Sequence, residues 1–210
     1  MTTELAHESL VWGTTVIEMK TGYGLTLDQE MRVLGLMGQL MDRLPRRILA
    51  TSLFLHAHRP SGTIAEWLDT MHNRLLPIAV ATGYLSAVDA LIEHTAYQPH
   101  EVELAWGSLP VRFHTNPVSK IGGNELGVRL KARAVEHLDC LSSKEIDLMA
   151  HHHMPAVIMP GDLSNGAAYG QAPVGAMLDR GFRHSLTTDP NPGSRPIRNL
   201  LRTVTLAVWT

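Results

Sequence analysis

Residues 109–139, LPVRFHTNPVSKIGGNELGVRLKARAVEHLD, contain the pattern that decides the fold. The run 109–116 is rich in apolar and β-branched residues, which predicts a strand, and 122–133 has the apolar spacing of a helix. Another short apolar run, 134–139, follows the predicted helix. A strand, a helix and a second strand in succession predict one βα repeat of a parallel sheet.

The same alternation of short apolar runs and helical patterns covers the rest of the chain. Further strands are expected at 14–19, 47–58, 87–93, 154–161 and 183–193, and helices at 26–44, 65–81, 98–107, 142–153, 173–181 and 195–210. Pro77 should kink or split the helix at 65–81, because proline lacks an amide proton. Apolar runs this continuous suit strands covered on both faces, so the sequence predicts an α/β fold, either a barrel or a doubly wound sheet. Residues 1–210 show no linker or low-complexity segment, which predicts one domain.

The amino-acid composition limits the classes of protein to which this chain is expected to belong. Hydrophobic residues make up 44% of the chain and charged residues 18%, which is typical of a globular fold rather than a disordered one. The formal net charge of −2 argues against a nucleic-acid partner, and no apolar run is long enough to cross a membrane. Cys140 is the single cysteine, so a disulfide framework is excluded and a cytoplasmic location is favoured. Twelve histidines are the unusual feature.

Polar side chains follow most of the predicted strands at the point where each strand ends. They are Tyr23 after the first, His56 and His58 at the second, His114 at the fourth, His137 at the fifth and Asp189 at the seventh. In a (β/α)8 barrel the carboxyl ends of the strands carry the chemistry. Imidazoles and a carboxylate that converge there suit zinc or ferrous iron. The alternative for each histidine is a hydrogen-bonded core or loop residue.

Other reaction types have weaker support in the sequence. No GxSxG motif or P-loop is present, and the glycine runs GYG and IGG are too short for a dinucleotide site. Cys140 has no evident base partner. The run His151-His152-His153 falls at the end of a predicted helix, on the rim opposite the strand ends, where polar residues are ordinary. These three histidines are therefore expected to be surface residues.

Six stretches together resemble one enzyme family, imidazolonepropionase. They are GTTVIEMKTGYGL (13–25), HAHRP (56–60), VRFHTNP (111–117), EHLDCLS (136–142), AVIMPG (156–161) and TTDPNPGSRP (187–196). The resemblance implies a metal-dependent amidohydrolase built on a TIM-like (β/α)8 barrel. It also implies that the chain supplies about seven βα units of that barrel, without the family's first strand or its small C-terminal β-rich domain.

The resemblance also implies a role for individual residues. His114 and Asp189 match positions that hold one metal ion, Zn²⁺ or Fe²⁺/Fe³⁺. His137 matches a histidine that polarises the carbonyl group of the substrate, and Asp189 would also move protons. Tyr23, His56, Asn191, Gly193 and Ser194 match positions that bind the substrate, imidazolone propionate.

The implied reaction is the opening of the ring of 4-imidazolone-5-propanoate to N-formimidoyl-L-glutamate in histidine catabolism. Two features depart from the family pattern. Pro117 stands where the family has an acidic or amide side chain, and the family's His-x-His metal pair belongs to the strand that would precede this chain. Three alternatives follow: one piece of an active hydrolase, an inactive remnant that acts as a binding module, or a chain completed by a homodimer partner or another chain.

Overall fold

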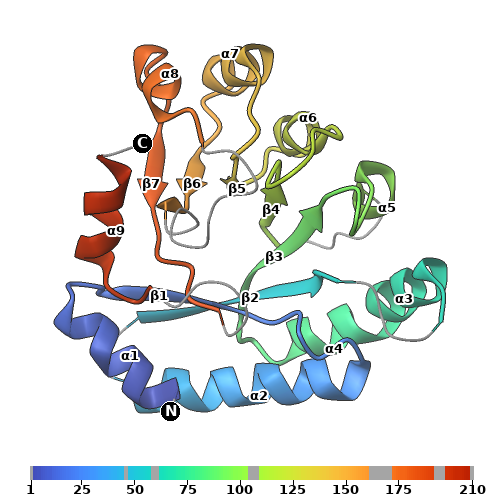
Figure 1. Cartoon of the computed structure of the whole chain (residues 1–210). Helices are drawn as coiled ribbons and strands as arrows, with labels where there is room; N and C mark the ends of the chain where they lie inside the picture. Colours follow the sequence, from blue (N-terminus) through green and yellow to red (C-terminus); the bar gives the residue numbers. More distant parts are fainter. Residues whose placement is uncertain are drawn as a thin grey trace.

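The computed structural model describes residues 2–44, 47–57, 62–103, 109–160, 172–191 and 197–208, and those residues form a parallel sheet surrounded by helices (Figure 1). The strands are β1 (Val16–Lys20), β2 (Arg47–Leu55), β3 (Leu85–Ile92), β4 (Val111–Thr115), β5 (Ala134–His137), β6 (Ala156–Ile158) and β7 (His184–Leu186). Every neighbouring pair is parallel, which confirms the βα alternation expected from the sequence.

The strand order decides between the two architectures that the sequence left open. The seven strands lie in the sheet in the order of the chain, from β1 to β7. A doubly wound sheet reverses its strand order at a switch point, whereas a barrel adds each strand beside the previous one. The sheet also curls, with the helices on its convex side (Figure 1). The prediction of a TIM-like barrel with about seven βα units is therefore confirmed.

The helices alternate with the strands as expected, with one addition at the start of the chain. They are α1 (Thr2–Val11), α2 (Leu27–Arg43), α3 (Ile64–Thr70), η1 (Met71–Leu75), α4 (Leu76–Ala81), α5 (Pro99–Glu103), α6 (Gly123–Arg129), α7 (Ser143–His151), α8 (Val174–Asp179) and α9 (Leu200–Ala207). The sequence patterns did not predict α1. Among these described helices, none is long and apolar enough to cross a membrane.

Pro77 has a milder effect than the predicted kink. The chain keeps helical torsion angles from α3 through η1 into α4, and Pro77 lies in the first turn of α4. The turn before it is a π-helix, in which the Leu76 amide donates to the Met71 carbonyl. A wider π turn accommodates the missing proline amide without ending the helix.

The two faces of the sheet differ in chemistry. Phe113 and Val135 are fully buried in the hydrophobic core, on the side where α6 packs against β4 and β5. Because side chains alternate between the faces of a strand, Arg112, His114 and Glu136 point to the concave side. The concave side of this sheet therefore carries charged residues, where a TIM barrel usually has bulky branched ones.

Most predicted elements are shorter in the structure, and for two of them the local geometry gives the reason. The last strand was expected over 183–193 but spans only His184–Leu186, because Asp189 adopts a left-handed backbone (φ 42°) and Pro190 follows it. The C-terminal helix was expected over 195–210, yet α9 begins only after Asn199. The Asn199 side chain accepts a hydrogen bond from the Arg202 amide (3.1 Å), which caps the helix at that point.

Candidate functional site

Tyr23 lies in a tight loop after β1 that a buried carboxylate shapes. Glu30, from α2, is fully buried and accepts hydrogen bonds from the amides of Gly22 (2.9 Å), Gly24 (2.6 Å) and Leu25 (2.9 Å). Gly22 has a φ of 110°, and a Cβ atom there would lie 2.2 Å from the Leu53 carbonyl oxygen. The glycine before Tyr23 is therefore required by both the torsion angle and the space. This loop leaves Tyr23 61% exposed.

His56 follows β2 and lies against Tyr23. The two ring centroids are 4.7 Å apart in an edge-to-face arrangement. Burial, together with His114, lowers the pKa of His56, while Asp89 and Asp189 act in the opposite direction. Among the described residues the buried Nδ1 of His56 has no hydrogen-bond partner. His56 is thus one of the groups that the structure gathers near the strand ends.

His114 and His137 form a second histidine pair at the ends of β4 and β5. Their exposed fractions are 6% and 8%, and their ring centroids are 5.0 Å apart. His137 has a left-handed backbone with a φ of 73°, and Leu138 after it has a φ of 70°. Such torsion angles are costly for residues other than glycine and are found at functional sites more often than elsewhere.

The loop after β7 contains the remaining predicted residues. Asp189 is partly exposed and lies close enough to His56 to influence its pKa. Asn191 is also partly exposed. Gly193, Ser194 and His58 lie outside the described residues. The structure therefore brings Tyr23 and His56 into contact, brings His114 beside His137, and places Asp189 near His56.

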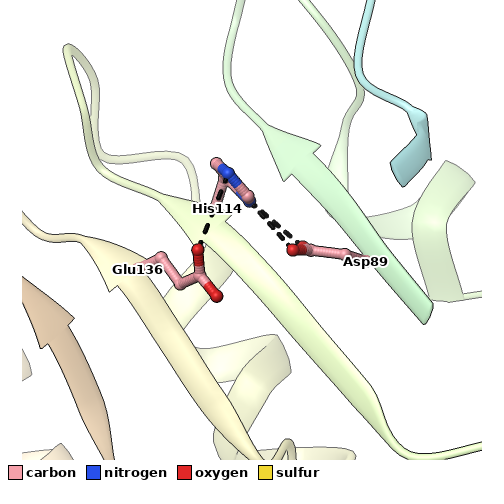
Figure 2. Close-up of side chains that lie close together, drawn as sticks. All are labelled: Asp89, His114 and Glu136. Carbon is pink, nitrogen blue, oxygen red and sulfur yellow. Dashed lines mark hydrogen bonds and ion pairs between the residues drawn. The ribbon is translucent and has the colours of Figure 1, made fainter. Parts of the chain in front are cut away.

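Four charged residues that sequence reasoning missed lie below this rim, inside the curled sheet. The Lys20 ammonium lies 2.6 Å from Asp89 Oδ2 and 2.8 Å from both carboxylate oxygens of Glu136. Arg112 donates to Glu136 Oε1 through Nε (2.9 Å) and Nη2 (2.6 Å). His114 lies between the two carboxylates, with Nδ1 3.1 Å from Asp89 Oδ2 and Nε2 3.7 Å from Glu136 Oε2 (Figure 2).

These contacts set the ionisation of the group. Burial opposes the charge on Asp89, but His114 and Lys20 outweigh it and hold the Asp89 pKa below its ordinary value. Burial likewise opposes the charge on Glu136, yet Lys20 and then His114 keep the pKa of Glu136 lowered. The pKa of His114 is raised, since the attraction of the two carboxylates exceeds the cost of its burial and the repulsion of Lys20. Asp89 and Glu136 are therefore held in their ionised forms, beside a histidine whose protonated form is favoured.

Asp89, His114 and Glu136 also have the donor chemistry of a metal site. One ligand atom from each lies within 4.8 Å of the others, and all three residues are buried. Imidazole and carboxylate are the ligands that zinc and iron accept. The donor set alone suits a metal ion, but the Lys20 ammonium already contacts both carboxylates, which leaves His114 as the candidate ligand of the three.

A signal for the missed residues is present in the sequence. Asp89, Arg112 and Glu136 fall inside runs that were expected to form covered strands, and Lys20 directly follows the run expected at 14–19. A charged side chain in a covered strand must be paired, because an isolated buried charge is very costly. Reading the strands for charges as well as for their ends would have identified this group, but not which charge meets which.

Two further expectations concern residues around the site. His151, His152 and His153 are all exposed at the end of α7, as expected for surface residues. Asn116 is buried, and its amide donates to Glu145 Oε1 (2.5 Å) at the start of α7. The Asn116 amide is therefore already engaged and does not replace the acidic or amide side chain that the resemblance expects at Pro117.

Sequence comparison finds imidazolonepropionases among the relatives of this chain, although no protein-family model matches it. The imidazolonepropionase of Acinetobacter baumannii is 31% identical over 195 residues, which are 90% of this chain and 49% of that protein. That of Pseudomonas savastanoi pv. phaseolicola is 33% identical over 191 residues, 88% of this chain and 48% of that protein. The chain thus spans about half the length of the curated relatives it matches.

Comparison with solved structures supports the barrel-like fold described above. A guanine deaminase from C. acetobutylicum with bound guanine superposes with a TM-score of 0.70 at 14% identity, over 98% of this chain and 53% of that one. An adenosine deaminase from Xanthomonas campestris with bound zinc gives 0.65 at 17% identity, over 99% and 49%. At these identities the likeness concerns the fold alone. This chain therefore resembles the imidazolonepropionases in sequence and shares the fold of about half of each of these two deaminases.

Proposed function

We propose that this chain carries imidazolonepropionase-type chemistry, the hydrolytic opening of the ring of 4-imidazolone-5-propanoate to N-formimidoyl-L-glutamate. The observation that carries the proposal is the gathering of Tyr23, His56, His114, His137 and Asp189 near the carboxyl ends of the strands. The sequence relatives of this chain also include imidazolonepropionases. In a barrel this rim is where substrates are held and converted.

In this proposal His114 and Asp189 would hold a single zinc or iron ion. When bound, such an ion supplies Lewis-acid activation of water and of a carbonyl group. Asp189 would accept the proton of the attacking water and return it to the ring nitrogen as the carbon–nitrogen bond breaks. His137 would stabilise the negative charge that develops on the carbonyl oxygen.

The remaining residues would bind and orient the substrate. Tyr23 and His56 form one side of the proposed site. Tyr23 is exposed, and the buried Nδ1 atom of His56, which has no hydrogen-bond partner among the described residues, is able to accept a hydrogen bond. Asn191, Gly193 and Ser194 would contribute the loop that follows β7. The substrate is a small anion. A homodimer partner or another completing chain would supply further metal ligands.

The test combines two measurements on one purified sample, the metal content and the loss of imidazolone absorbance. The wild-type chain is expected to hold metal and to consume the substrate, and Asp189→Ala is expected to lose both properties. Asp179→Ala, which removes an exposed carboxylate at the end of α8, is the matched control and should keep both. Ring opening by Asp189→Ala at the wild-type rate would contradict the proposal.

A second candidate function is that of a binding module without hydrolase activity, and one observation favours it. Pro117 has no proton to transfer, and the neighbouring Asn116 amide is bonded to Glu145. If this function is correct, the folded wild-type chain binds imidazolone propionate in a calorimetric titration, holds no stoichiometric metal and leaves the ring intact. Robust turnover would exclude it.

A further inference from the structure

The charged residues around His114, inside the curled sheet, have no role assigned in the proposed reaction, and their composition is unusual. Three carboxylates meet two permanent cations there: Glu18, Asp89 and Glu136 against Lys20 and Arg112. Asp89 is fully buried and Glu136 nearly so, with side chains 0% and 2% exposed. Carboxylates this deeply buried require close partners. Each partner can therefore be assigned from the distances.

Lys20 is the resident cation of Asp89 and Glu136. Its ammonium lies 2.6 Å from the first carboxylate and 2.8 Å from both oxygens of the second. A zinc ion bound to the same oxygens would lie about 2.0–2.2 Å from them, in the space that the ammonium fills. Two cations do not share that space, so the pair of carboxylates is closed to a metal while Lys20 is in place.

The remaining contact of Asp89 is with His114. Both carboxylate oxygens lie near the Nδ1 atom of the ring, at 3.2 Å for Oδ1 and 3.1 Å for Oδ2. An ionised carboxylate only accepts hydrogen bonds, so Nδ1 must carry a proton. In the neutral ring this leaves Nε2 as the nitrogen with a free electron pair, and Nε2 faces away from Asp89 (Figure 2).

We propose that Asp89, paired with Lys20, is a positioning residue that fixes the tautomer and the ring orientation of His114 and leaves Nε2 as the metal-binding nitrogen. A carboxylate that accepts the proton of the other ring nitrogen holds metal-binding histidines in this way. Glu136 lies 3.7 Å from Nε2, so positive charge gained at that nitrogen has a second carboxylate beside it. The metal half of this inference rests on the proposed function, but the tautomer does not.

The first experiment measures the tautomer directly in the protein freed of metal by a chelator. Nitrogen-15 NMR reports which ring nitrogen of His114 carries the proton at a pH where the ring is neutral. The His114 signals are assigned as those that disappear in His114→Gln. We expect the proton on Nδ1 in the wild-type chain and a shift toward Nε2 in Asp89→Asn, whose amide is able to donate. A wild-type ring with its proton on Nε2 would overturn the proposal, even if Asp89→Asn does not fold.

The second experiment measures the affinity for Co²⁺ from its visible absorption. Asp89→Asn is expected to bind about 10–100-fold more weakly than the wild-type chain. Glu18→Gln is the matched control, because Glu18 is a partly exposed carboxylate that also contacts Lys20 and Arg112. Its removal is expected to change the affinity for Co²⁺ by no more than about threefold. Equal losses in the two variants would refute a specific role for Asp89.

The two experiments separate the inference from the proposed function. If Co²⁺ does not bind the wild-type chain, or binds equally well in His114→Gln, the proposed metal role of His114 fails. The tautomer measured by NMR then still decides whether Asp89 positions the ring. If Co²⁺ binds through His114 but the tautomer is unchanged in Asp89→Asn and the affinity is also unchanged, the function stands and this inference falls.

Discussion

Two regions of the described structure that contain buried carboxylates stabilise them by different means. Inside the curled sheet, Asp89 and Glu136 are neutralised by the ammonium of Lys20 and, for Glu136, by Arg112. Beneath the loops at the strand ends, Glu30 accepts three backbone amides, and Glu93 accepts the amides of Val118 (3.1 Å) and Ser119 (3.0 Å).

The difference reflects what each region does. Amide donors fix the path of the backbone, so Glu30 and Glu93 determine the shape of the loops that surround the proposed site. Buried cations keep neighbouring carboxylates ionised, so Lys20 determines the electrostatic environment of His114. Loss of a loop carboxylate is therefore expected to alter the nearby backbone, whereas loss of an interior ion pair is expected to lower the stability of the whole fold.

The largest expected effect is the loss of the interior cation. Lys20→Met keeps the length of the side chain but leaves Asp89 and Glu136 without their shared ammonium, which should lower the free energy of unfolding by about 3–5 kcal/mol. Urea unfolding followed by circular dichroism measures this change. Lys144→Met, at an exposed position of α7, is the control and should change stability by less than about 0.5 kcal/mol. Equal effects of both variants would remove the distinction between the two regions.

A smaller effect is expected from the loop carboxylate. Glu30→Gln keeps one acceptor oxygen but turns an amide donor toward a backbone N–H, which should cost about 1.5–3 kcal/mol. The same substitution at Glu66, an exposed helix-capping residue, is the matched control and should cost less. Thermal unfolding gives the stability, and the fluorescence of an added substrate analogue tests whether the Tyr23 loop has moved. A cost for Glu30→Gln above that for Lys20→Met would reverse the comparison.

The smallest effect on stability is expected from a change of pH in the presence of a chelator. The pKa values of Asp89 and Glu136 lie below their ordinary values of 3.8 and 4.5, so their stabilising contribution is present above those values and is lost as the pH falls through the folded-state pKa. The pKa of His114 lies above 6.5, so its contribution is present below 6.5 and is lost as the pH rises through the folded-state pKa.

Stability should therefore be greatest between about pH 5 and 6.5 and decline on both sides, by no more than about 1.4 kcal/mol per pH unit for one proton. Urea midpoints measured across this range test the curve. His114→Gln should remove the decline on the alkaline side, whereas His151→Gln, at an exposed position, should preserve it. An unchanged alkaline decline in His114→Gln would mean that another group causes it.

The sequence by itself predicted the parallel βα alternation, because apolar runs of strand length separated by helical patterns permit few other folds. It also predicted that Tyr23, His56, His114, His137 and Asp189 follow strands, since the end of an apolar run is visible in the sequence. The shortness of β7 was not visible, because it depends on the left-handed torsion angle of Asp189.

Only the tertiary structure decided which charges pair inside the sheet. Lys20, Asp89 and Glu136 lie in three strands, and their side chains meet because the sheet curls and the strand register places His114 beside Glu136. Sequence spacing carries no information on contacts between strands so far apart in the chain. The sequence thus determined where the polar residues end each strand, and the curvature and register of the sheet determined that a lysine, rather than a metal ion, is the cation between Asp89 and Glu136.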